Sequence, residues 1–109
     1  MIVSEKNISD ALAYLAIDPH PLALARKYVV DAENNAKRLF AEAYLNTEGT
    51  VRDRESEVEA NLIYRKAKSD EAEAILDLER HKARSRAAEM LIEVWRSENA
   101  NVRAAERVR

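Results

Sequence analysis

The 109-residue chain contains no cysteine, one glycine and two prolines. The lack of cysteine excludes disulfides, thiol catalysis and thiolate zinc sites. Phosphate-binding loops and dinucleotide-binding fingerprints each need more than one glycine, so both are excluded. Histidine is also scarce. Ile17 and Leu78 stand three positions before His20 and His81, so the Glu-x-x-His motifs of di-iron bundles are missing. We therefore expect a protein that is not an enzyme and uses no cofactor or metal.

Long apolar runs are missing as well. The apolar stretches are short pieces such as residues 22–25 and 90–92, whereas a membrane-spanning helix needs about 20 apolar residues. The opening sequence, MIVSEKNISD, lacks the basic start and apolar run of a targeting segment. We expect no membrane partner and a cytoplasmic location.

The abundant residues are those that form long helices. Charged residues make up 35% of the chain and hydrophobic residues 47%, a composition typical of coiled coils and long-helix proteins. Prolines at positions 19 and 21 and the turn-forming sequence NTEGT at 46–50 mark two breaks. The sequence thus predicts an all-α single domain over 1–109, with a short helix over 5–16, a second helix over 21–45, a long helix over 51–98 and a frayed basic tail over 99–109.

The ends of these helices carry recognisable signals. Ser4, Asp18 and Thr50 are predicted to cap the three helices, because a short polar side chain can accept a hydrogen bond from the first turn. Gly49 suits the left-handed backbone position that often follows a helix. Ser69-Asp70 marks a possible bend in the long helix.

Apolar residues recur at alternating spacings of three and four along both longer helices, which is a heptad register. The seam of the second helix is rich in alanine, so a neighbouring helix can approach closely. It consists of Leu22, Ala25, Val29, Ala32, Ala36, Leu39 and Ala43. The seam of the long helix is interrupted near its middle by three polar residues, and it consists of Ala60, Tyr64, Ala67, Glu71, Ala74, Leu78, His81, Ser85, Ala88, Ile92 and Trp95. The two seams predict an antiparallel, coiled-coil-like hairpin.

The two helices differ in length, and this difference indicates association. At about 1.5 Å per residue, the second helix would be roughly 37 Å long and the long helix roughly 72 Å. The second half of the long helix, which holds Ala87, Ala88, Met90, Leu91, Ile92, Val94 and Trp95, would then be an exposed apolar patch. We expect a homo-oligomer, a dimer or larger, or a complex with another protein. The predicted interface residues are Tyr64, Leu78, Leu91, Ile92 and Trp95. The alternative is a bend that folds this half back into a monomeric bundle.

Charge is unevenly distributed along the chain. Residues 46–79 carry 5 basic and 10 acidic side chains, whereas residues 80–109 carry 8 basic and 4 acidic ones. The basic run Arg80, Lys82, Arg84 and Arg86 is the candidate nucleic-acid contact, because phosphate binding needs such a cluster. The alternative is that these cations pair with the acidic residues across an antiparallel interface.

Four segments of the chain, covering most of its length, resemble a group of small helical proteins of tailed bacteriophages and prophages. They are ISDALAYLA at 8–16, EGTVRDRE at 48–55, Tyr64-Arg65 and IEVWRSENAN at 92–101. Members of that group often lie in early-region recombination or replication modules, and the group usually ends soon after the last segment in a basic tail. This chain continues with residues 102–109.

The resemblance, the uncovered apolar half of the long helix and the basic C-terminal third together favour a non-enzymatic phage accessory protein in the bacterial host cell. Such a protein would self-associate through its helices and bind a recombination or replication protein, or single-stranded DNA. One alternative is an inhibitor of a host defence enzyme, which would present the acidic residues Asp53, Glu55, Glu57 and Glu59 to a basic site. Another is a virion or scaffold component.

Overall fold

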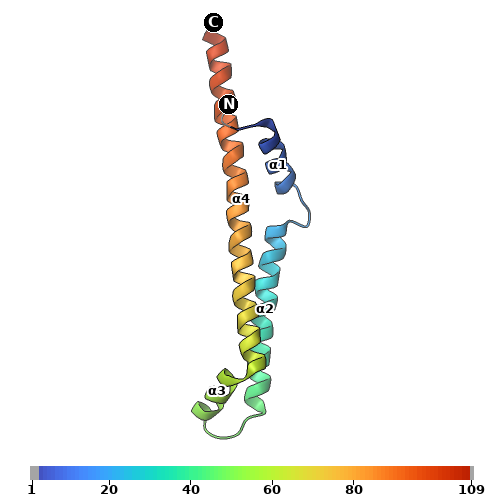
Figure 1. Cartoon of the computed structure of the whole chain (residues 1–109), viewed down its shortest axis with the longest axis vertical. Coiled ribbons are helices and arrows are strands. Elements are labelled where there is room, and N and C mark those ends of the chain that lie inside the picture. Colours follow the sequence, from blue (N-terminus) through green and yellow to red (C-terminus); the bar gives the residue numbers. More distant parts are fainter. Residues whose placement is uncertain (1–2, 109) are drawn as a thin grey trace. The chain divides into compact units, whose positions relative to one another are not determined.

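A computed structural model of the chain describes residues 3–108 (Figure 1). Within this range the protein is all-α, with no strand and four helices: α1 (Glu5–Leu15), α2 (Pro21–Leu45), α3 (Val51–Ala60) and α4 (Leu62–Val108). The predicted all-α fold with a long C-terminal helix is confirmed. The bounds of the first two helices agree with the prediction to within one residue.

The predicted single domain contains two compact units. One, here called the hairpin unit, is Ala23–Glu79. The other, called the terminal unit, combines Met1–Leu22 with Arg80–Arg109. The helix α4 contributes its first part to the hairpin unit and the rest to the terminal unit, and each unit is described separately below.

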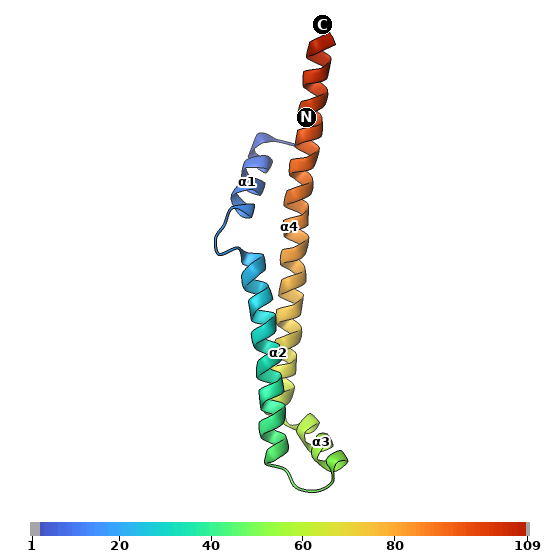
Figure 2. The same ribbon diagram turned by 180° about the vertical axis from the view of Figure 1, so that it is seen from behind.

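In the hairpin unit, α2 and the first part of α4 lie side by side and run in opposite directions (Figures 1 and 2). Ala25, Val29 and Ala36 of α2 and Ala67 of α4 are buried, between 2% and 9% exposed. All four are positions of the predicted seams, and among the seam positions of both helices only Ala60 is fully exposed. The heptad register therefore identified the buried faces. The buried residues are small, and small side chains let helices approach closely.

The short helix α3 begins where the sequence predicts. Thr50 caps it by accepting a hydrogen bond on Oγ1 from the amide of Asp53 at 3.2 Å. Gly49 has φ +117°, a region that favours glycine because it has no Cβ. Val58 is 1% exposed, the most deeply buried side chain among the described residues.

Arg54 fastens α3 to the end of α2. Its Nη2 donates to the carbonyl of Tyr44 at 2.7 Å, and its guanidinium lies over the Tyr44 ring, 4.0 Å from the centroid. Thr47 Oγ1 donates to the same carbonyl at 2.9 Å. These bonds add to one from the backbone amide of Thr47 at 3.3 Å, so a carbonyl in the last turn of α2 is well satisfied.

The predicted continuous helix over 51–98 is wrong at one point, Asn61. This residue leaves the helical conformation with φ −65° and ψ 126°, which separates α3 from α4. Its Oδ1 accepts hydrogen bonds from the amides of Ile63 at 2.9 Å and Tyr64 at 3.2 Å. Asparagine is among the best capping residues, so the side chain replaces the helical bonds that the interruption removes.

The rest of α4 also differs from the prediction. The helix passes through Ser69 and Asp70 without interruption, so the possible bend is not found there. The frayed tail over 99–109 is likewise wrong for its described residues, because α4 continues to Val108. Alanine, glutamate and arginine in this stretch are strong helix formers, which explains the continuation without burial. Position 109 lies outside the described residues.

In the terminal unit, α1 lies alongside the C-terminal part of α4 (Figures 1 and 2). Ser4 caps α1 as predicted, accepting a bond from the amide of Asn7 at 3.2 Å. Ala11 and Tyr14 of α1 and Ala88 of α4 form the core, with Leu15 and Ile92 packed against it. The second half of the long helix is therefore only partly uncovered, with Met90 and Val94 still exposed. The helix α1 is short, but it covers one side.

The first turn of α2 has a different cap from the one predicted. The amide of Leu22 donates to His20 Nδ1 at 3.1 Å, so His20 takes the capping role that we assigned to Asp18. Tyr14 lies edge-on to the His20 ring, with 5.0 Å between the centroids. The imidazole is therefore held both by the helix end and by the core of the terminal unit.

Candidate interaction surface

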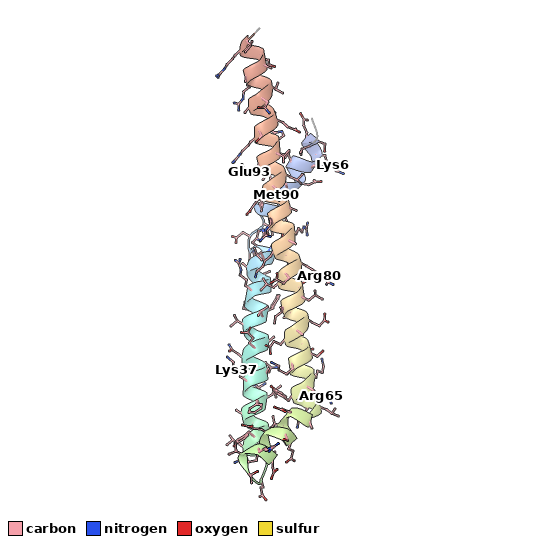
Figure 3. The ribbon with its side chains drawn as sticks, turned by 90° about the vertical axis from the view of Figure 1, so that its left-hand side faces the viewer. Lys6, Lys37, Arg65, Arg80, Met90 and Glu93 are labelled. Carbon is pink, nitrogen blue, oxygen red and sulfur yellow. The ribbon has the colours of Figure 1, made fainter. Side chains whose placement is uncertain are left out.

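An exposed apolar stripe runs along α4 in the terminal unit. We call Ala83, Ala87, Met90 and Val94 the outer stripe. Their spacings of four, three and four residues place them on one face of an α-helix. Met90 is 60% exposed and Val94 39% exposed, and both alanines are exposed, although Ala87 also lines the edge of a groove between α4 and α1. Figure 3 views α4 from the side away from α1 and labels Met90 on it.

The core contacts lie on another face of the same helix. Ser85 and Ala88 are buried against α1, and Ile92 is partly buried there. The structure thus divides the predicted apolar patch into two sets. Ala88, Leu91, Ile92 and Trp95 are partly or fully covered, whereas Ala87, Met90 and Val94 remain exposed.

Charged side chains border the outer stripe. Arg86 stands one position before Ala87, and Glu93 stands one position before Val94, so each flanks the apolar face on the same side. Both are exposed, and Glu93 Oε1 accepts a hydrogen bond from Arg96 Nη1 at 3.0 Å. Both side chains of the Glu93–Arg96 ion pair are exposed to solvent, and such pairs contribute little to stability.

The four residues of the predicted basic contact, Arg80, Lys82, Arg84 and Arg86, are all exposed on α4. One of them has a structural role as well. The Arg84 guanidinium lies over the Tyr14 ring, 4.2 Å from its centroid. Arg84 therefore faces α1, whereas Arg86 borders the outer stripe. The run supplies positive charge to more than one face of the helix.

The predicted interface residues are all partly buried within their own chain. In the hairpin unit, Tyr64 meets Phe40 of α2 edge-on, with 5.4 Å between the ring centroids, and Leu78 lies on the buried seam. In the terminal unit, Ile92 packs against the core, and Leu91 lines a shallow groove with α1. Trp95 lines another groove with Val102. The most exposed apolar side chains of α4 are elsewhere.

A groove in the hairpin unit is lined by Phe40, Tyr64, Glu33, Lys68 and Glu71. Lys68 Nζ donates to Glu71 Oε2 at 3.0 Å, and this hydrogen bond, with the carboxylate charge, raises the pKa of Lys68. The groove combines two aromatic rings with an ion pair.

Other kinds of site are also absent from the described part of the chain. Residues 3–108 contain no cluster of three or more histidine or acidic side chains that could hold a metal ion. Among the same residues, no helix combines the length and apolar character needed to cross a bilayer. Comparisons with protein-family models, curated proteins and solved structures find no match to this chain.

The apolar patch predicted from the sequence contains Ala87, Met90 and Val94 of the outer stripe. The prediction did not distinguish these residues from those that α4 buries within its own chain. Ala83 was not included at all. The available signal was a second series at spacings of three and four, offset by two residues from the buried seam. Two seams on opposite sides of one helix indicate contacts on both sides.

Proposed function

We propose that the chain is a non-enzymatic accessory protein that self-associates through α4 and binds a partner protein. The observation that carries the proposal is the outer stripe. Its apolar residues follow helical spacing and face solvent, whereas α1 covers the opposite side of α4. Apolar side chains that line up on one exposed face of a helix are typical of a protein–protein contact.

The resemblance to small helical phage proteins supports a particular setting for this activity. In that setting the partner is a phage or host protein of recombination or replication, and the site of action is the bacterial host cell.

The basic run supports contact with single-stranded DNA as part of the same function. Arg80, Lys82, Arg84 and Arg86 are all exposed, and each neutralised phosphate would add salt-dependent affinity. A gel shift at low salt with single- and double-stranded DNA tests this contact. Failure to bind either would reject direct DNA contact and leave the protein-binding function intact.

Light scattering of the full chain tests self-association. The expected mass is that of a dimer or larger assembly, and Met90→Glu should lower it because burial of a charge without a partner is costly. Val30→Glu is a matched control, since Val30 is 52% exposed on α2. A monomeric wild type at high protein concentration would overturn the proposal.

A further inference from the structure

We infer that the outer stripe binds the same stripe of a second copy of this chain, with the two α4 helices antiparallel. The inference rests on the proposed self-association and specifies its surface and direction. Two features of the stripe favour a second, antiparallel copy. They are the order of its side-chain sizes and the charges beside it.

The order of sizes in the stripe is small, small, large, large. Antiparallel pairing centred between Ala87 and Met90 sets Ala87 against Met90 of the second copy. It also sets Ala83 against Val94, and symmetry repeats both layers. Each layer then contains one alanine and one larger side chain. The side-chain volume is therefore similar from layer to layer along the interface, as close packing requires.

Parallel pairing in register would give a different fit. Two Met90 side chains would meet in one layer and two Ala87 side chains in the next. The alanine layers would leave space while the methionine and valine layers would hold the helices apart. Uneven layers of this kind lose dispersion contacts.

Charge complementarity supports the same direction. In an antiparallel coiled coil, the g positions, which immediately precede the a-type core positions (here Ala87 and Val94), face the g positions of the other helix. Arg86 and Glu93 occupy such positions, so Arg86 of each copy lies opposite Glu93 of the other. Two equivalent attractive pairs result, which favours a second copy over a partner of arbitrary charge.

Disulfide cross-linking tests the direction directly, because the natural chain has no cysteine. Tagged Ala83→Cys protein is mixed with untagged Val94→Cys protein under mild oxidation. Only the mixed disulfide is expected, since equal positions of the two copies would stand about 16 Å apart along the axis. Ala83→Cys mixed with Val30→Cys, on α2, is the control for random collision and should give no more than background.

The possible outcomes separate this inference from the proposed function. Disulfides between equal positions would show parallel pairing and overturn the inference. No mixed disulfide from a protein that light scattering shows to be oligomeric would place self-association on another surface. A monomeric wild type would overturn the proposed function together with the inference.

Charge reversal provides an independent measurement. Arg86→Glu and Glu93→Arg should each weaken the dimer about fivefold, because each makes both pairs repulsive. The double variant should recover most of the wild-type dissociation constant, measured by sedimentation. Arg52→Glu, an exposed charge reversal on α3, should leave it unchanged. Equal weakening by the single and double variants would contradict the pairing.

Discussion

The guanidinium of Arg84 lies over the ring of Tyr14, 4.2 Å from its centroid, and joins α4 to α1 within the terminal unit. Tyr14 is 5% exposed and also meets the edge of His20. One aromatic ring thus links α1, the residue that caps α2, and a cation of the basic run. Because of this contact, Arg84 has a role in stability apart from any contact with a polyanion.

We predict that Arg84→Met lowers the free energy of unfolding by about 0.5–1 kcal/mol. The substitution keeps an unbranched apolar stem over the ring but removes the cation–π attraction. Urea denaturation monitored by circular dichroism measures the change. Arg80→Met is the matched control on the same helix and should alter stability less. An equal effect of the two variants would show that the ring contact contributes nothing.

The hydroxyl groups of Tyr14 and Ser85 share a buried hydrogen bond of 3.3 Å. We predict that Tyr14→Phe and Ser85→Ala each cost about 1 kcal/mol, because each leaves the other hydroxyl buried without this partner. The double variant should cost less than the sum of the two, since no orphaned group remains. Strict additivity in a double-mutant cycle would mean that the bond has no energetic weight.

Asn61 is predicted to control the start of α4. Asn61→Ala should destabilise the protein by about 1 kcal/mol, because the amides of Ile63 and Tyr64 lose their acceptor. Asn61→Asp supplies the same acceptor and should retain most of the stability. Thermal unfolding of the two variants compares them, and equal loss in both would assign the effect to something other than capping.

The Lys68–Glu71 pair gives a prediction about pH. The hydrogen bond from Lys68 and the charge of Glu71 raise the pKa of Lys68, so the pair stabilises the fold below the ordinary lysine pKa. That contribution disappears as the pH rises through the higher folded-state value.

Glu71→Gln should therefore return the pKa of Lys68 towards its ordinary value, and the wild type should lose its advantage over the variant around pH 10 and above. An NMR titration of the lysine side chain measures the pKa directly. An unchanged pKa in the variant would contradict the assignment, and Glu73→Gln, on an exposed neighbouring position, is the control.

Periodicity predicted the buried faces well. Ala25, Ala36, Ala67 and Ala88 all lie on the predicted seams and are buried, because a heptad repeat directly specifies which face of a helix meets its neighbour. The same pattern concealed the break at Asn61. Apolar spacing continues on both sides of that residue, and without glycine or proline only its capping chemistry marked the interruption.

The outer stripe was harder to predict for a different reason. A helix with apolar residues on two sides does not specify which side its own chain will cover. The predicted seam places Ala88 and Ile92 on a buried face, but it does not identify α1 as the helix that covers them or specify that Met90 and Val94 stay exposed. That assignment depends on tertiary packing of α1, which a periodic pattern does not encode.

The burial of Val58 has a consequence for motion within the hairpin unit. On α3 only this side chain is fully buried, and Asn61 interrupts the backbone hydrogen bonds between α3 and α4. The short helix can therefore open without unwinding its longer neighbour. Its amides should exchange with solvent deuterium well before those in the first part of α4, as a separate unit of local unfolding.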